Sequence, residues 1–252
     1  MNGIPYLMYH RIGDPADRED RYTVTEGSFR AHLNYLQLAG YDVTCVGRAL
    51  GRPASMRPRL VLTFDDGYDT DLAVAAPLLL DHGFTATFYV VAGNLGQPGS
   101  LTEKGVAELA ALGFEIGSHS LTHAYLDDLD AAALDREIAG SRTRLEDVLG
   151  RRVRHFACPG GRWNRAVVEA AQRAGYESLA TSQVGLNRPT TDPFRLYRLA
   201  IQNGLSLESY AHLCRGEGLA ERRVREMVLS AAKSVLGNGR YDRVRRSFLK
   251  GA

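Results

Sequence analysis

Two pairs of chemically active side chains each follow an apolar run in this sequence. Asp65 and Asp66 come directly after the apolar run 60–64. His119 and His123 follow a second apolar run further along the chain. One Asp and two His can hold a divalent metal and leave a coordination position open for water or substrate. The second Asp is then free to act as a base, so the four residues outline a metal-dependent hydrolase site.

Each pair by itself has a simpler explanation. An Asp-Asp-Gly sequence after a strand is usually a turn, because Asp and Gly are favoured where the chain reverses. The helical zinc motif of metalloproteases has Glu directly after its first His, whereas this chain has Ser120 there. We therefore expect His119 and His123 on a loop at a strand end. Together, the two pairs indicate a metal site far more specifically than either does alone.

Short apolar runs alternate with segments of helical periodicity. The runs show no regular alternation of apolar and polar residues, which is typical of parallel strands buried on both faces. They span residues 4–10, 60–64, 86–91, 114–118, 155–158, 178–181 and 197–201. Glycines follow most of the predicted helices, which cover 29–36, 72–80, 103–111, 131–149 and 166–174. Strand–helix alternation without a Gly-rich dinucleotide fingerprint favours an α/β barrel over an open doubly wound sheet.

In a parallel barrel, chemistry gathers at the carboxyl ends of the strands. Six candidate residues fall there by this assignment: Asp65, Asp66, His119, His123, Gly160 and His10. Their common position follows from the strand assignments alone.

Three stretches carry a resemblance to a known family. The Asp pair and the His pair resemble the first two motifs of the polysaccharide deacetylase (NodB-homology) family, and residues 156–161 resemble the third. The resemblance extends over residues 4–201. The opening strand with Tyr9 and His10 is similar to a circularly permuted bacterial branch, in which that strand occupies the place of the usual final motif. An irregular (β/α)7 TIM-like barrel over 1–205 is implied, with 206–252 as a basic helical C-terminal extension rather than a separate domain.

The resemblance also implies a cofactor and its ligands. Asp66, His119 and His123 would hold one divalent metal ion. We expect Zn²⁺, while Co²⁺, Ni²⁺ and Mn²⁺ stay open because a set of imidazoles and a carboxylate suits several metals. Asp65 would be the general base, and it should stay ionised beside the cation.

Two further roles follow from the same resemblance. The backbone N–H of Gly160 would stabilise the oxyanion of the tetrahedral intermediate. His10 would protonate the leaving amine, because His is the side chain most often used for acid–base catalysis. The alternative for His10 is a buried structural residue of the first strand.

The third motif departs from the family pattern. Members of the family often have an Arg that holds the catalytic Asp, and this chain has Ala157 at that position. Arg162 and Arg198 are the available guanidinium groups, and each could pair with Asp65, bind substrate or be purely structural. Trp163 is the only Trp of the chain. It could stack on a sugar ring, or it could fill the core.

The expected reaction is removal of N-acetyl groups from an amino sugar or an N-acetylated polysaccharide. Acetate and a free amine would be the products. Alternatives on the same scaffold are deformylation of a lipid-linked amino sugar, amide cleavage in a ureide, and O-deacetylation. A catalytically silent carbohydrate-binding protein is disfavoured, because the three candidate ligands and the candidate base are all present.

Composition sets broad limits. The chain has 252 residues, 44% hydrophobic and 24% charged, with a net charge of +2, which is typical of one large globular domain and excludes a disordered or fibrous protein. Three cysteines form no disulfide framework. A secretory leader and a run of eighteen apolar residues are both missing, so we expect a cytoplasmic protein.

The C-terminal segment is basic. From Arg215 onward ten Lys and Arg residues stand against four Asp and Glu. Such a segment is most often a solvated helix, although it could also bring the protein to the inner membrane through weak contact with anionic lipids. The charges are not interleaved with aromatic residues and match no recognition motif, so we expect no nucleic-acid partner.

Overall fold

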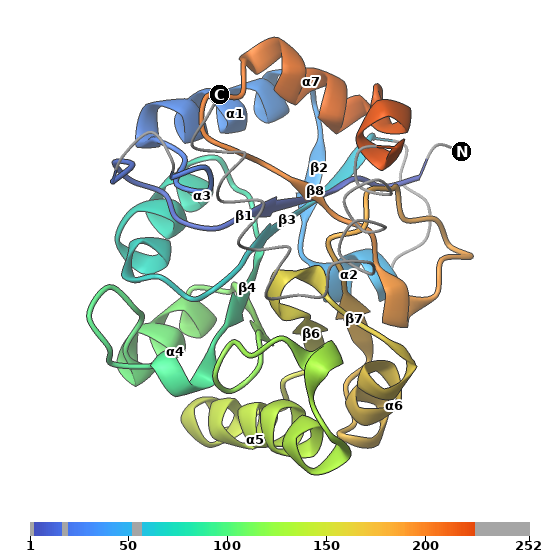
Figure 1. Cartoon of the computed structure of the whole chain (residues 1–252). Helices are drawn as coiled ribbons and strands as arrows, with labels where there is room; N and C mark the ends of the chain where they lie inside the picture. Colours follow the sequence, from blue (N-terminus) through green and yellow to red (C-terminus); the bar gives the residue numbers. More distant parts are fainter. Residues whose placement is uncertain (1–2, 17–19, 52–56, 225–252) are drawn as a thin grey trace.

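The computed structural model describes residues 3–16, 20–51 and 57–224. At its centre a curled sheet is surrounded by a ring of helices (Figure 1). Every paired strand runs parallel to its neighbour. In this part of the chain the sheet has eight strands: β1 (Tyr6–Tyr9), β2 (Asp42–Thr44), β3 (Arg59–Phe64), β4 (Thr87–Val90), β5 (Glu115–Ser118), β6 (His155–Ala157), β7 (Ser178–Ala180) and β8 (Leu199–Ala200).

The strand order curls the sheet into an irregular barrel. The order is β7-β6-β5-β4-β3-β1-β8, and β2 is an additional partner of β3. One chain segment approaches both ends of this path. Leu196 bridges to Ala180 of β7, and Leu199, three residues later, pairs with Leu7 of β1. The α/β barrel class predicted from the sequence is therefore confirmed.

Most helices lie outside the sheet, and five of the α-helices begin at a side-chain cap. Thr25, Thr102, Asp130, Asn164 and Ser206 each accept a hydrogen bond from a backbone N–H of the first turn. The α-helices are α1 (Glu26–Leu38), α2 (Val46–Gly51), α3 (Ala76–Asp81), α4 (Glu103–Ala111), α5 (Ala131–Leu149), α6 (Arg165–Arg173) and α7 (Leu207–Arg215). Shorter turns are the π-helix η1 (Asp71–Ala75) and the 3₁₀ turns η2 (Ala92–Asn94), η3 (Leu126–Asp128), η4 (Pro159–Gly161) and η5 (Pro193–Arg195).

Alternate residues of the strands enter two separate hydrophobic clusters. Phe64 and Phe88 belong to the larger one, between the sheet and the helices. Val61 and Tyr89 belong to the smaller one, inside the barrel. Val46 of α2 joins the inner cluster, so α2 packs against the barrel interior.

The structure adds two elements that the sequence did not predict and shortens others. β2 has only three residues and begins with the charged Asp42, which pairs with Arg59, so no apolar run marks it. α2 is likewise only six residues long. β8 is confined to Leu199–Ala200 within the predicted range 197–201. The predicted helix 72–80 begins as the π-helix η1 and continues as α3.

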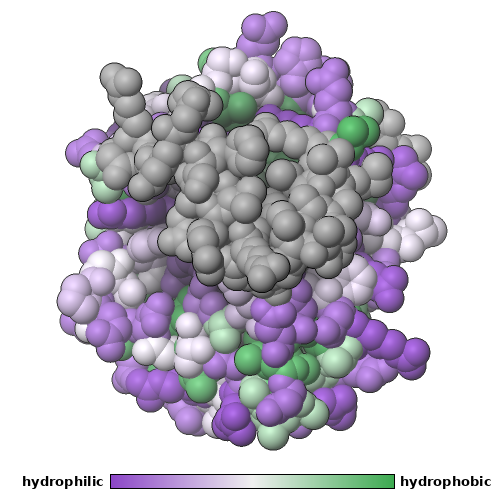
Figure 2. All heavy atoms as spheres, viewed as in Figure 1, coloured by the Kyte–Doolittle hydropathy of each residue, from purple (hydrophilic) through white to green (hydrophobic). Residues whose placement is uncertain are grey.

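α7 belongs to the region predicted as an extension, and it packs on the barrel. Tyr210 of α7 stacks on His32 of α1 with ring centroids 3.9 Å apart. His32 in turn lies 3.1 Å from the hydroxyl of Tyr9. Residues 225–252 of the extension lie outside the described residues, so the predicted membrane contact and the cytoplasmic location stay predictions. No helix among the described residues is long and apolar enough to cross a bilayer. The face in Figure 2 is mostly hydrophilic around its rim.

Candidate active site at the carboxyl ends of the strands

The parallel register brings the candidate residues to one end of the barrel. Tyr9, the last residue of β1, pairs with Phe64, the last residue of β3. His10 and Asp65 therefore leave neighbouring strands at the same level. His119 directly follows β5 and donates its backbone N–H to the carbonyl of Val90, at the end of β4.

Three side chains form a cluster that could hold a metal ion. Ligand atoms of Asp66, His119 and His123 all lie within 4.8 Å of one another. The Asp66 Oδ1 atom is 3.5 Å from Nε2 of His119 and 3.3 Å from Nε2 of His123. Nδ1 of His119 lies 2.8 Å from the carbonyl of Ala157. If Nδ1–H donates to that carbonyl, as in many metal-binding histidines, the lone pair of Nε2 faces Asp66.

The chemistry of this cluster fits a divalent cation. Oδ1 of Asp66 is buried, and Nε2 of His119 and Nε2 of His123 lie beside it at the long end of hydrogen-bonding distance. Burial by itself raises the pKa of Asp66, but hydrogen bonding to His123 and the charge of His119 outweigh burial and hold the pKa far below its ordinary value. A buried carboxylate oxygen facing two imidazole nitrogens is a donor set that zinc and related metals use.

The backbone is unusual at the same residues. Asp66, Ser120 and His123 have φ values of 79°, 69° and 63°, in the left-handed region that side chains other than Gly rarely occupy. Each such residue costs roughly 1–3 kcal/mol unless its surroundings determine it. In the described part of the chain these are the only non-glycine residues with positive φ, and all three lie at the cluster.

Asp65 is held by Arg198. NH1 of Arg198 donates to Oδ1 of Asp65 at 2.6 Å, and NH2 donates to Oδ2 at 2.8 Å. Both residues are almost completely buried. Nε of Arg198 donates to the carbonyl of Thr181, which fixes the guanidinium plane. Burial raises the pKa of Asp65, but the Arg198 charge outweighs burial, and His119 adds to it, so the pKa lies below its usual value.

This arrangement resolves the departure at Ala157 and corrects one prediction. Arg198 takes the position of the missing Arg, since it makes a bidentate pair with Asp65. The substrate-binding role predicted for Arg198 is wrong, because its side chain is 0% exposed. Arg162 lies elsewhere, with its guanidinium carbon 3.7 Å from the centre of the Tyr125 ring and NH1 3.8 Å from Asp128.

Gly160 satisfies two requirements for a backbone donor. Its φ of 60° strains any other residue, and an added Cβ would lie 2.9 Å from Cε1 of Tyr125. Its N–H donates to no backbone carbonyl among the described residues. The N–H is therefore available to a ligand. Sequence reasoning missed Tyr125, an aromatic side chain that is 40% exposed beside Gly160.

His10 and Trp163 differ in the contacts that their side chains make. The His10 ring packs against Tyr22 at a centroid distance of 4.6 Å, and its Nδ1 is buried without a partner among the described residues. Trp163 is half-buried against the main core, with the guanidinium carbon of Arg195 4.9 Å from its ring centre. These contacts give Trp163 a packing role, and its contact with substrate stays a prediction.

Glu137 was also missed at the sequence level. It is 8% exposed on α5, and its carboxylate accepts three hydrogen bonds from Leu121 and Thr122, within the turn between the two histidines. A signal was present in the sequence. Glu137 follows Leu134 by three positions and precedes Ser141 by four, so it falls on the buried stripe of the helix.

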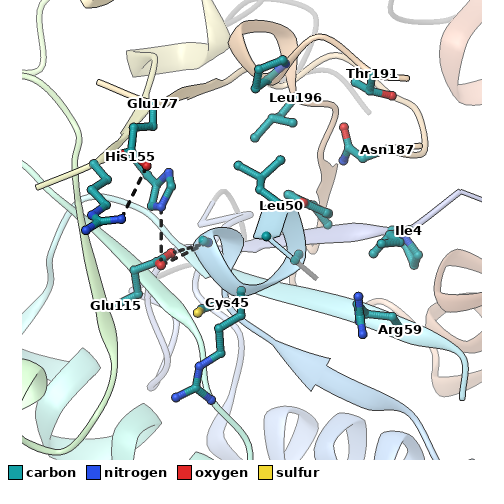
Figure 3. Close-up of a pocket in the computed structure, with 18 of the residues that line it drawn as sticks. Ile4, Cys45, Leu50, Arg59, Glu115, His155, Glu177, Asn187, Thr191 and Leu196 are labelled. Carbon is teal, nitrogen blue, oxygen red and sulfur yellow. Dashed lines mark hydrogen bonds and ion pairs between the residues drawn. The ribbon is translucent and has the colours of Figure 1, made fainter. Parts of the chain in front are cut away.

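A separate cavity of about 1520 Å³ lies at the other end of the barrel (Figure 3). It is lined by α2 and by residues where strands begin, such as Arg59, Glu115 and His155. Glu115 lies 3.5 Å from His155 and accepts hydrogen bonds from Gly47 and Thr87. Residues at the amino ends of barrel strands usually contribute stability rather than catalysis. The cavity is therefore distinct from the carboxylate–imidazole cluster.

Comparisons with known proteins agree with this geometry. The family model described as polysaccharide deacetylase matches residues 53–179. YxkH of Bacillus subtilis (strain 168), which carries the name of a polysaccharide deacetylase, is 28% identical over 207 residues, covering 81% of this chain and 73% of the relative.

Solved structures share the fold. The polysaccharide deacetylase BC0361 from Bacillus cereus superposes with a TM-score of 0.77 at 25% identity, covering 84% of this chain and 69% of that one. The Streptococcus pyogenes deacetylase PplD, solved in complex with acetate, gives a TM-score of 0.78 at 24% identity, covering 84% and 98%. Given the family match, the chain belongs to the polysaccharide deacetylase family, which is metal-dependent and deacetylates N-acetylated saccharides.

Proposed function

We propose that this chain hydrolyses the N-acetyl group of an amino sugar within a saccharide, with Asp65 as the general base. The observation that carries the proposal is the Asp65–Arg198 pair beside the Asp66, His119 and His123 cluster. A carboxylate oriented by a fixed guanidinium and placed next to a metal-binding set has the geometry of a base that activates water.

Asp66, His119 and His123 would hold the metal, and Zn²⁺ is our expectation for its identity. When bound, such a cation supplies a water of lowered pKa and positive charge for the developing oxyanion. The chain itself prepares the ligands. The contact of His119 Nδ1 with the Ala157 carbonyl and the left-handed conformation of Asp66 fix where their ligand atoms lie.

The remaining chemistry belongs to three residues of the chain. Asp65 stays ionised because Arg198 lowers its pKa, and it can take a proton from the attacking water. The Gly160 N–H can donate to the carbonyl oxygen as negative charge develops there. His10 can deliver a proton to the amine nitrogen as the C–N bond breaks. Without that proton the amide anion would be a very poor leaving group.

The substrate proposal is an N-acetylated saccharide. The relatives named above include polysaccharide deacetylases, and the PplD structure contains acetate, the product expected here. On this chain, Tyr125 provides an exposed aromatic ring next to Gly160. The Arg162 guanidinium lies over that ring, and the exposed part of the ring can stack on a pyranose ring.

Acetate release tests the proposal. The purified protein would be incubated with N-acetylated monosaccharides, oligosaccharides and polysaccharides, with and without a chelator, and with zinc added back. We expect acetate release that chelation abolishes and zinc restores. The Asp65→Asn variant prepared in parallel controls for contaminating hydrolases. N-formylated and O-acetylated saccharides would be tested beside the N-acetylated substrates, and activity only on one of these would replace the proposed reaction with another on the same site.

A further inference from the structure

Glu137 lies outside the proposed catalytic set and yet contacts the turn that carries two of its members. The turn 119–123 follows β5 and is hydrogen-bonded to Glu137 of α5. Oε2 of Glu137 accepts the N–H groups of Leu121 at 3.0 Å and Thr122 at 2.9 Å. Oε1 accepts the hydroxyl of Thr122 at 2.6 Å. Hydrogen bonds to an ionised, nearly buried carboxylate are stronger than those between neutral groups.

The conformation of the turn explains why an anion fits there. Ser120 is left-handed, and the two following N–H groups point in one direction. Successive N–H groups next to a left-handed residue form a concave anion site in many proteins. In this chain the site is filled from within by Glu137. The hydroxyl of Ser120 adds a fourth bond, accepting the N–H of His123 at 2.9 Å.

The other side of the turn is held by the backbone of η2. The N–H groups of Ala92 and Gly93 donate to the carbonyls of Ser120 and Leu121. A Cβ on Gly93 would lie 2.4 Å from the Leu121 oxygen, so this approach leaves no room for a side chain. The turn is therefore clamped between η2 and Glu137, and only the Glu137 side depends on a single replaceable side chain.

We propose that Glu137 is a positioning residue of the metal centre. It holds the turn in the strained conformation that keeps His119 and His123 directed at Asp66. The inference rests on the proposed function, because it assumes that these three residues bind a metal. Without Glu137 the left-handed residues would relax, and the two imidazoles would have to be brought together again at each binding event. Residues that support metal ligands in this way typically contribute 10- to 100-fold to metal affinity.

The test measures zinc affinity, by competition with a chromophoric chelator, in metal-free Glu137→Gln protein. Gln has the same size but loses the charge, so its oxygen accepts the two N–H groups more weakly, and its NH₂ cannot accept from the Thr122 hydroxyl. Asp147→Asn is the matched control, since it makes the same change at an exposed position of the same helix. We expect the dissociation constant for zinc to rise about 10- to 100-fold in Glu137→Gln and to stay at the wild-type value in Asp147→Asn.

A second variant and a kinetic measurement separate positioning from a general loss of structure. Thr122→Val removes only one of the three bonds to Glu137 and should weaken zinc binding several-fold, whether or not Glu137→Gln folds. At saturating zinc both variants should recover most of their kcat, because Asp65 and Arg198 are untouched. If Glu137→Gln folds and its zinc affinity is unchanged, the inference is overturned and the proposed function stays intact. If Glu137→Gln does not fold, unchanged zinc affinity in Thr122→Val has the same meaning. Absence of zinc binding by the wild-type protein overturns the proposed function itself.

Discussion

Arg198 and Asp65 are 133 positions apart in the chain and share two hydrogen bonds inside the barrel. The pair joins the end of β3 to the residue before β8, and these strands flank β1 on either side. Arg198 also donates to the carbonyl of Thr181, just after β7. One guanidinium therefore ties the proposed base to the segment that closes the sheet, and the base is in place only when the barrel has closed.

Replacing Asp65 and Asp66 one at a time should distinguish the general base from the metal ligand. Asp65→Asn should keep the metal and lose about 10²- to 10⁴-fold in kcat, because only proton transfer is removed. Asp66→Asn should lose metal at equal zinc concentration, because one of three ligands loses its charge. Metal content by elemental analysis, measured beside kcat, checks both. Loss of metal from Asp65→Asn would show that the roles are exchanged or shared.

Weakening the Asp65–Arg198 pair should move the pH dependence. Arg198 lowers the pKa of Asp65, so a weaker pair lets that pKa rise. Arg198→Lys keeps the charge but loses the bidentate geometry. The base would then be protonated at a higher pH, and the acid limb of kcat/KM should shift to higher pH. Arg162→Lys is the control, because Arg162 lies against Tyr125, and an acid limb that is identical in both variants would contradict the assignment.

His10→Ala should impair amide hydrolysis selectively. An amine leaving group must be protonated as the bond breaks, so kcat on an N-acetylated sugar should fall about 10²- to 10⁴-fold with little change in KM. An activated aryl acetate expels a stable phenolate and needs no such proton, so its hydrolysis should hardly change. Equal losses on both substrates would indicate that His10 supports the site in some other way.

Asp71 should make the protein less stable as pH rises. It is fully buried, and its two carboxylate oxygens have no partner among the described residues. Burial, reinforced by the charges of Asp66 and Asp65, raises its pKa well above the ordinary value. The folded state then holds a proton that the unfolded state releases above pH about 4, so unfolding becomes easier by up to about 1.4 kcal/mol per pH unit.

Asp71→Asn should remove this slope, because Asn does not titrate. The difference in free energy of unfolding between variant and wild type, measured by denaturant titration at pH 5 to 8, should grow with pH in favour of the variant. The exposed Asp81→Asn, at the end of α3, gives the baseline for a charge change nearby, because Asp81 is not among the charges that raise the pKa of Asp71. A difference that is constant across this range would mean that Asp71 is ionised in the folded protein.

The sequence predicted best those site residues that directly follow an apolar run. Asp65 and His119 could be placed because a strand must end before a polar group can face the barrel mouth. Arg162 and Arg198 could not be told apart, because the choice depends on how residues 196–200 close the sheet. That closure involves pairing with both β7 and β1, which no local pattern records.

Glu137 shows a second reason why a site residue could not be predicted from the sequence. A Glu within a predicted amphipathic helix is normally assigned to solvent, and only its position on the buried stripe indicates otherwise. Its partners are backbone N–H groups of a turn, and these have no sequence signature. β2 and α2 were missed because three or six residues are too few for periodicity to emerge.

The barrel closure also bears on how active members of the family are recognised. The segment that the family model matches, 53–179, contains the cluster of Asp66, His119 and His123 but neither Arg198 nor His10. A fragment cut at those borders would keep the proposed ligands and lose both the residue that orients the proposed base and the proposed acid. A match to this segment alone therefore does not show that a chain can orient its base or protonate its leaving group. A homologous sequence that has neither an Arg in its third motif nor one ahead of its closing strand should bind zinc and release little acetate.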